Sequence, residues 1–375
     1  MQYKKGTSLE IKKINKSRIF QLIYQRKKIS KQDIAGELQL SMPTVTQNLK
    51  ELQSQGLIME KGTFNSTGGR KARALACVPD ARFAIGLEIT HHNVSIVAVN
   101  LLGTVIQKQR CHAEYQKADF YYSNLGMLIE DFISRFSLDR SKILGVGIGV
   151  QGLLSPDGQT IVYGKILGST GEMLSYYAQH IQFPCMLCHD ADAAAFAEMW
   201  ISGHIQNAVY ISLGNNVGGS VFIGGKPYTG EISHSGMVEH MTLVPNGKPC
   251  YCGQRGCMEA YCAAQVLTEG TEESLEDFFQ RLRSGEPTHQ KIWEEYLYYL
   301  SVSVNNLHMA FDCDVILGGH AGAFIGEDLN RLKRMAAERN SFAQEADYLK
   351  LCRYTTEAVA AGAALRYVDT FLKMI

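Results

Sequence analysis

Residues 240–257, HMTLVPNGKPCYCGQRGC, are the stretch from which the rest of the chain can be interpreted. This stretch contains one imidazole and three thiols, at His240, Cys250, Cys252 and Cys257. Three thiolates and one imidazole match a closed tetrahedral zinc site, and sulfur ligands favour zinc over hard cations such as magnesium. Gly253 and Gly256 would let the chain wrap tightly around an ion. We therefore predict a structural zinc loop over 240–257, the alternative being a set of buried free thiols.

Three other cysteines lie near this loop or form a pair elsewhere. Cys262 follows the loop closely and could be mistaken for a ligand. Cys185 and Cys188 form a Cys-x-x-Cys, but no second pair accompanies them, so we interpret them as buried strand cysteines, with a redox or second metal role as the alternative. The chain begins without an apolar leader and has no stretch of about 18 uncharged apolar residues, so we expect a cytoplasmic protein with reduced thiols and no membrane contact.

The charge of the chain is unevenly distributed. The 375 residues contain 37 basic and 37 acidic side chains, and 46% of them are hydrophobic, which excludes wholesale disorder. Residues 1–75 hold 15 Lys or Arg and 5 Asp or Glu, a net charge of +10, whereas the remainder has a net charge of −10. A basic segment on an acidic body indicates a polyanion-binding module, the alternative being a merely solvated basic face.

The basic segment has the spacing of a helix-turn-helix. Apolar residues over 14–23 predict a first helix that ends near Arg26, and Ser30 is a suitable N-cap for a second helix over 31–38. A third helix, from about Pro43 to Gln55, would bury a stripe formed by Val45, Leu49 and Leu52. Its opposite face offers small, polar or cationic groups for a major groove: Thr44, Thr46, Gln47 and Lys50. Gln47 could pair with adenine and Lys50 could contact a phosphate.

A β-hairpin follows the third helix. Residues 56–61 and 72–78 predict two short strands, joined by a turn that carries Arg70 and Lys71 beside two glycines. A hairpin in this place is a wing, and its tip would approach the DNA backbone or minor groove. We therefore assign residues 1–80 to a winged helix-turn-helix DNA-binding domain, although trihelical packing alone is common in other proteins.

Beyond residue 80, predicted strands alternate with helices. The clearest elements are strands at 83–89, 94–99, 143–150, 209–213, 219–223 and 315–319, and helices at 191–200 and 356–372. This alternation predicts an α/β body of two lobes over residues 81–375.

The winged helix-turn-helix, the α/β body and the His-x9-Cys-x-Cys-x4-Cys spacing together resemble the ROK family of repressors and sugar kinases. The resemblance covers nearly the whole chain, and the zinc spacing is its most specific part. It implies a two-lobed, actin-like ATPase architecture around a cleft. Winged members are similar to sugar-responsive repressors, such as those for xylose or N-acetylglucosamine, whereas most members without the wing are sugar kinases.

The kinase motifs implied by the resemblance are altered. Family kinases carry Asp-x-Gly-Gly-Thr-Lys in the first strand turn, where this chain has EITHHN at 88–93. The second phosphate loop, Leu-Gly-Thr-Gly-x-Gly-Gly in the family, is LGNNVGG at 213–219. Side chains in place of glycines would crowd a phosphate, so we predict that ATP phosphoryl transfer is lost and that the chain is not an enzyme.

The sugar contacts implied by the resemblance are partly kept. Asp190 matches the family's general base, and His189 stands where the family has Asn. The family's Glu-x-x-His retains its histidine as His240, but Met237 replaces its glutamate, and a thioether cannot take the same hydrogen bonds. Glu259 matches the third contact. The candidate ligand-binding residues are therefore His189, Asp190, His240 and Glu259, while Asp190 could instead be a helix N-terminal acid and Glu259 a solvated loop acid.

We interpret the chain as a DNA-binding regulator, a repressor of carbohydrate-utilisation genes that binds an operator in double-stranded DNA as a homodimer or homotetramer. A sugar or sugar derivative in the cleft would change the angle between the lobes and the spacing of the DNA heads. The alternatives are a sugar kinase with a DNA-binding head, a regulator without an effector, and an adaptor whose basic segment binds another acidic partner.

Overall fold

The computed structural model describes residues 8–64, 72–342, 344–354 and 357–375. Its N-terminal part, called the head below, is a compact group of three helices and a small sheet of order β1-β3-β2. The elements of the head are α1 (Ser8–Arg26), β1 (Ile29–Ser30), α2 (Lys31–Leu38), α3 (Met42–Ser54), β2 (Ile58–Thr63) and β3 (Arg73–Cys77). The predicted helices and hairpin strands are thus confirmed to within a few residues.

Local signals in the sequence explain these elements. The Ser30 hydroxyl accepts a hydrogen bond from the Asp33 amide (3.1 Å) and so caps α2, as predicted. Ser41 caps α3 in the same way, and Pro43 lies in the first turn of that helix, where its missing N–H costs nothing. The predicted stripe of Val45, Leu49 and Leu52 is buried.

The first lobe of the body is built on a five-stranded sheet of order β10-β7-β4-β5-β6. Strands β4, β5 and β6 are antiparallel neighbours, whereas β4 pairs with β7, and β7 with β10, in parallel. Its strands are β4 (Phe83–Ile89), β5 (Asn93–Asn100), β6 (Val105–His112), β7 (Ile143–Val150) and β10 (Cys185–His189), with a small hairpin of β8 (Leu153–Leu154) and β9 (Ile161–Tyr163). The helices packed on it are α4 (Asp119–Arg135), α5 (Leu174–Ala178) and the C-terminal α12 (Ala358–Met374).

The second lobe repeats the same strand pattern. Its sheet has the order β13-β12-β11-β14-β15, with two antiparallel and two parallel pairings in the same sequence as in the first lobe. Its elements are β11 (Ala208–Leu213), β12 (Val217–Ile223), β13 (Lys226–Pro227), α7 (Glu259–Cys262), α8 (Leu275–Arg283), α9 (Pro287–Phe311), β14 (Asp314–Gly318), α10 (Gly319–Gly322), α11 (Leu329–Ala337) and β15 (Leu349–Leu351). The repeated topology confirms the predicted two-lobed, actin-like body.

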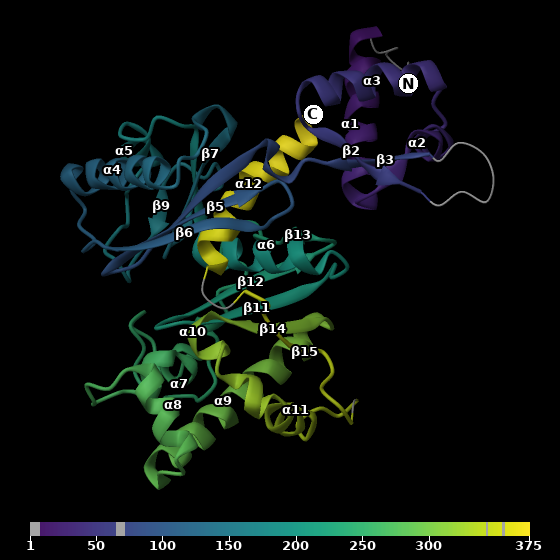
Figure 1. Ribbon diagram of the computed structural model, residues 1–375. Helices are drawn as coiled ribbons and strands as arrows, with labels where there is room; N and C mark the ends of the chain where they lie inside the picture. Colours follow the sequence, from purple (N-terminus) through teal and green to yellow (C-terminus); the bar gives the residue numbers. More distant parts are fainter. Residues whose placement is uncertain (1–7, 65–71, 343, 355–356) are drawn as a thin grey trace.

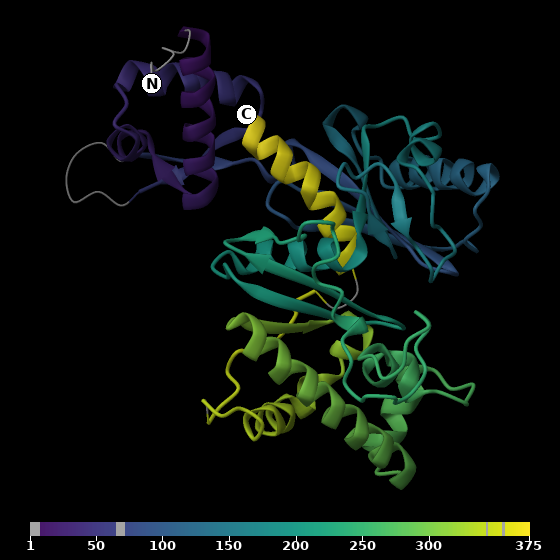
Figure 2. The same cartoon turned by 180° about the vertical axis from the view of Figure 1, so that it is seen from behind.

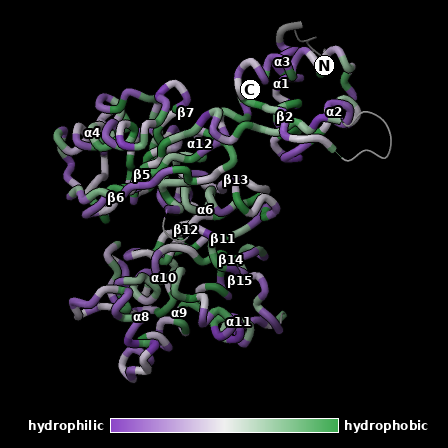
Figure 3. The backbone as a smooth tube through the Cα atoms, viewed as in Figure 1, coloured by the Kyte–Doolittle hydropathy of each residue, from purple (hydrophilic) through white to green (hydrophobic). Residues whose placement is uncertain are grey.

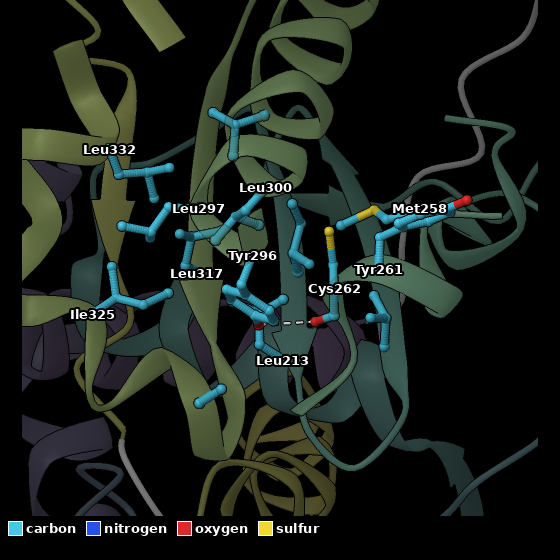
Figure 4. Packing of buried hydrophobic residues seen from close by; sticks show 14 of the residues in the cluster. Leu213, Met258, Tyr261, Cys262, Tyr296, Leu297, Leu300, Leu317, Ile325 and Leu332 are labelled. Carbon is cyan, nitrogen blue, oxygen red and sulfur yellow. Dashed lines mark hydrogen bonds between the residues drawn. The ribbon is translucent and has the colours of Figure 1, made fainter. Parts of the chain in front are cut away.

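The core of the second lobe fixes the position of the loop that holds the predicted metal ligands. Tyr296 of α9 is buried and donates a hydrogen bond to the Cys262 carbonyl (2.8 Å), next to Met258 and Tyr261 (Figure 4). Figure 3 colours the chain by hydropathy and shows that α11, at the outside of the second lobe, is mostly hydrophilic. None of the helices formed by the described residues is long and apolar enough to cross a bilayer.

The helix α6 (Asp190–Ser202) lies between the two lobes and packs along α12. The contact is very close, because a side chain at Gly362 of α12 would lie 1.7 Å from the carbonyl oxygen of Ala193 in α6. Gly86 of β4 lets α12 approach the first sheet in the same manner. The two helices therefore form a tightly packed pair at the centre of the molecule.

The head is joined to the body by a shared core. Tyr24 of α1 donates a hydrogen bond to the Leu101 carbonyl (2.8 Å), and its ring meets Trp200 of α6 edge to face. Ile23 of α1 belongs to the same buried cluster as Leu365 of α12. Both views show the C-terminus beside the head (Figures 1 and 2).

Candidate functional site

The four predicted metal ligands come together in space. His240 Nδ1 lies 3.7 Å from Cys250 Sγ, Cys252 Sγ lies 3.8 Å from Cys257 Sγ, and all four ligand atoms lie within 4.8 Å of one another. A tetrahedral zinc with Zn–S bonds of about 2.3 Å holds its sulfur atoms about 3.8 Å apart. The cluster therefore has the spacing and the donor set of a closed zinc site.

The loop is shaped by glycines and by its own hydrogen bonds. Gly253 and Gly256 have φ of +97° and +80°, a region that other residues rarely adopt. A side chain at Gly256 would lie 1.7 Å from the Val244 carbonyl oxygen, so only glycine fits there. The Cys250 amide donates to the Gln254 carbonyl (2.9 Å), which closes the turn between the first and last thiols.

The remaining cysteines discussed above lie elsewhere. Cys262 is fully buried and its thiol faces the Ser303 hydroxyl, at 3.8 Å, in the core of the second lobe. Cys185 and Cys188 both lie in β10, three residues apart, and so face opposite sides of the sheet. That placement separates the two thiols and agrees with their interpretation as strand residues.

A small hollow of about 50 Å³ lies between the lobes. The first lobe contributes Gln151, Tyr163 and His189, together with Asp190 at the start of α6, and the second contributes Asn216, Met237, Glu239 and Tyr251. Two of the predicted ligand-binding residues, His189 and Asp190, thus line one cavity, which we call the interlobe pocket.

His189 lies between two aspartates. Its Nε2 is 3.3 Å from Asp190 Oδ1, and its Nδ1 is 3.6 Å from Asp192 Oδ2. Burial opposes protonation of His189, but the hydrogen bond and charge of Asp192 and the charge of Asp190 outweigh it and raise the pKa of His189 to about 9. The imidazole is therefore protonated at neutral pH and balances part of the negative charge in the pocket.

Glu239 is a pocket residue that the sequence did not single out. It lies in a short 3-10 turn, Val238–His240, directly before the metal-ligand histidine, and its side chain is only 8% exposed. Its Oε2 atom has no hydrogen-bond partner among the residues that the structure describes. The family pattern has a glutamate at position 237, where this chain has Met237. A carboxylate only two residues further on was therefore the signal that could have identified Glu239.

Glu259 makes contacts within its own chain. It is 3% exposed, and its two oxygens accept hydrogen bonds from the Asn216 side chain and the Val217 amide, each at 2.7 Å. These donors belong to the loop at 213–219, which we predicted to correspond to the second phosphate loop of the family kinases. Glu259 is therefore a buried clamp on that loop rather than a solvated acid, and it does not line the interlobe pocket.

The β4–β5 turn, which we predicted to correspond to the first phosphate loop of the family kinases, carries two imidazoles. His91 and His92 are exposed at the β4–β5 turn, which is closed by a hydrogen bond from the Thr90 amide to the Asn93 carbonyl (3.0 Å). His92 Nδ1 lies 2.9 Å from both carboxylate oxygens of Glu114. The turn therefore presents bulky side chains where a glycine pair would leave room for a phosphate.

The predicted DNA-contacting residues of α3 share its outer face. Gln47 and Lys50 are exposed, and Thr44 and Thr46 are half-buried. The Thr46 hydroxyl donates to the Met42 carbonyl (2.6 Å), and that of Thr44 lies 2.8 Å from the Ser41 hydroxyl. Of these four, Gln47 and Lys50 extend farthest into solvent and are the best placed to reach a groove.

The remaining two predicted DNA contacts, Arg70 and Lys71, lie outside the described residues. A hollow of about 560 Å³ lies between α3 and the strands β2 and β3, and its lining includes Lys31, Thr46, Lys50 and Arg73. The same lining also includes Glu60, Met42, Leu49 and Leu75, so charged and apolar side chains lie together in this hollow.

Comparisons with known proteins agree with this architecture. A family model described as the ROK family matches residues 84–366, and one described as winged helix-turn-helix DNA-binding matches residues 13–59. The chain is 25% identical to the xylose repressor of Caldicellulosiruptor bescii, covering 98% of both proteins. It is also 25% identical to the N-acetylglucosamine repressor of Shigella flexneri, covering 72% of this chain and 67% of that protein.

Solved structures share the fold. A ROK family transcriptional regulator, a homologue of the Escherichia coli MLC protein, covers 97% of both chains with a TM-score of 0.77 and 20% identity. A ROK family glucokinase from Streptomyces griseus, in complex with glucose and AMPPNP, covers 76% of this chain and 98% of its own, with a TM-score of 0.65 and 20% identity. The glucokinase likeness thus covers about three quarters of this chain, whereas the regulator likeness covers nearly all of it.

Proposed function

The chain belongs to the ROK family, and from that premise we propose that it is a DNA-binding transcriptional regulator, a repressor of carbohydrate-utilisation genes that responds to a sugar or sugar-derived effector. The observation that carries the proposal is the exposed polar face of α3 in a winged helix-turn-helix head whose core continues into a two-lobed body. The repressors that the chain resembles over most of its length support the same assignment.

The head contacts DNA through α3 and the wing. Gln47 and Lys50 enter the major groove with Thr44 and Thr46, and Arg70 and Lys71 approach the backbone or minor groove. Two copies of the chain in a homodimer, or four in a homotetramer, present paired heads to a pseudo-palindromic operator.

The cluster of His240, Cys250, Cys252 and Cys257 holds a structural zinc. Its distances and its thiolate-rich donor set support zinc, and the closed set of four protein ligands leaves no position for a substrate. The ion would hold together the loop that carries His240 and, one residue earlier, Glu239.

The effector binds in the interlobe pocket, and α6 transmits its presence to the head. Asp190 begins α6 in the pocket, and Trp200, near the other end of the same helix, packs against Tyr24 of the head. A ligand that favours one lobe arrangement therefore shifts one end of a helix whose other end contacts the DNA-binding unit.

Kinase activity is the alternative function, and the altered phosphate loops argue against it. Asn216 is held by Glu259, and His91 and His92 fill the first turn. A coupled assay of ADP release, with common sugars and a high protein concentration, separates the two functions. Sustained ADP release with any sugar would favour the kinase.

DNA binding is tested by fluorescence anisotropy with duplexes from the promoters of carbohydrate-utilisation genes of the source genome. We expect affinity to fall steeply as salt rises, because phosphate contacts release counterions. Lys50→Ala should weaken binding, whereas Lys226→Ala, an exposed lysine on the body, should not. Absence of salt-dependent binding to any duplex would refute the proposal and favour an adaptor for another acidic partner.

A further inference from the structure

The Glu239 carboxylate lies in an environment that its own chain leaves incomplete. The residue is only 8% exposed, and its Oε2 atom accepts no hydrogen bond from any described residue. Nearly all buried polar groups in native proteins have a hydrogen-bond partner, because burying one without a partner costs free energy. Because Glu239 also lines a pocket, its unpartnered oxygen indicates a hydrogen-bond donor that comes from outside the chain.

The pocket places Glu239 beside a residue that cannot replace it. Met237 and Glu239 both line the hollow, two positions apart on the same short turn. A thioether is a weak acceptor, whereas a carboxylate accepts several hydrogen bonds. Glu239 thus provides the carboxyl group that can accept hydrogen bonds from a ligand in this part of the pocket. It does so from a backbone position two residues beyond the one where the family has its glutamate.

The charges around the pocket select against an anionic ligand. Asp190 and Glu239 line the hollow with acidic side chains, and Asp192 contacts the Nδ1 side of His189, whereas His189 and Lys165 are the basic residues of the lining. His189 is occupied by the two aspartates, and Lys165 Nζ donates to the backbone carbonyls of Tyr251 (3.2 Å) and Cys252 (3.4 Å). A phosphate group would meet these acidic side chains with Lys165 as the one cation of the described lining that no carboxylate pairs, whereas neutral hydroxyl groups would find several acceptors.

The size of the hollow adds a conformational requirement. A volume of about 50 Å³ holds only a few water molecules, and small-molecule pockets usually measure about 300 Å³ or more. Because the lining residues come from both lobes, a sugar ring enters only if the lobes separate.

We propose that Glu239 is the specificity-determining acceptor of the interlobe pocket and that the pocket takes an unphosphorylated, hydroxyl-rich sugar, whose entry widens the gap between the lobes. The inference rests on the proposed function, since it concerns the effector site of a regulator. It adds a residue outside the four that the resemblance supplied, and it excludes sugar phosphates as the preferred ligand.

The test uses the full-length, metal-loaded protein and isothermal titration with D-xylose, D-glucose, N-acetyl-D-glucosamine and N-acetyl-D-glucosamine 6-phosphate. We expect wild-type protein to bind at least one neutral sugar, and N-acetyl-D-glucosamine more tightly than its 6-phosphate. Glu239→Gln should weaken that binding about tenfold or more, because the amide puts an NH2 donor in place of one of the two acceptor oxygens. Glu276→Gln, an exposed carboxylate of α8 in the second lobe, is the matched control and should bind like wild type.

Two further measurements keep the result interpretable. Metal content and melting temperature establish that Glu239→Gln is folded, and Glu239→Asp, which shortens the side chain, is the second variant if it is not. Small-angle X-ray scattering of wild type with saturating sugar should show a larger radius of gyration than without it.

Binding of none of the three neutral sugars, tighter binding of the 6-phosphate than of its parent sugar, or unchanged affinity in Glu239→Gln would each overturn the inference. A smaller or unchanged radius of gyration would overturn the widening. Operator affinity is measured separately without sugar, so a protein that binds sugar but no DNA would refute the proposed function and leave the pocket inference standing.

Discussion

The close packing of α12 against α6 yields a prediction whose sign can be derived from the structure. Replacing Gly362 by alanine would put a Cβ atom 1.7 Å from the Ala193 carbonyl oxygen, although such atoms are essentially never closer than 3.0 Å. The two helices would therefore have to separate by more than an ångström along a buried contact. Overpacking of this kind costs about 1–3 kcal/mol or more.

Helix propensity acts in the opposite direction but is smaller. Alanine is favoured over glycine inside a helix by at most about 1 kcal/mol. We therefore expect Gly362→Ala to lower the free energy of unfolding of the body by about 2 kcal/mol. Its melting temperature should fall by about 4 °C or more, given about 2–4 °C per kcal/mol for domains of this size.

Gly36 in α2 provides a matched control. It is also a helical glycine, but a Cβ atom there would meet nothing within 4 Å. Gly36→Ala should thus leave the melting temperature unchanged or raise it, because only the propensity and unfolded-state terms act. Differential scanning calorimetry of both variants measures the pair. A Gly362→Ala protein at least as stable as wild type would refute the close packing described for α6 and α12.

Three further predictions concern the metal loop, the DNA surface and the pocket. Cys257→Ser should abolish stoichiometric zinc by metal analysis, and full occupancy would contradict the ligand set. Gln47→Ala should relax the discrimination between DNA bases at one position of the site. Lys50→Ala should instead weaken binding to all duplexes alike and reduce the slope of log affinity against log salt concentration by about 1. Identical binding profiles of the two variants would contradict these roles. The pKa of His189 in the folded protein, about 9, lies above its ordinary value of 6.5, so its stabilising contribution is complete below pH 6.5 and is lost as the pH rises through 9. His189→Gln should therefore flatten the dependence of the unfolding free energy on pH between these values. An unchanged pH profile would count against the pairing of His189 with Asp190 and Asp192.

The features that the sequence predicted well are those encoded over short distances. Val45, Leu49 and Leu52 follow the helical period, so their burial in α3 could be inferred from spacing alone. The ligands of the metal loop also lie within a short stretch, and glycine-rich turns could bring them together with little help from the rest of the chain.

The features that the sequence did not predict depend on distant parts of the chain. Glu259 is captured by Asn216, 43 residues earlier, and no local pattern distinguishes such a clamp from a ligand contact. Glu239 reaches the pocket only because a 3-10 turn and the opposite lobe enclose its side chain. The division of charge near residue 75 indicated two separate modules, but it could not reveal the shared core through which Tyr24 meets Trp200.

The position of the chain's end beside the head has a practical consequence for experiments. The Leu372 carbonyl accepts a hydrogen bond from Gln21 of α1 (3.4 Å), so a peptide fused to Ile375 would emerge beside α1 of the head, the proposed DNA-binding unit. Residues 269–272, exposed on the second lobe, are a better place to attach a fluorophore or an immobilisation tag when DNA binding is to be measured.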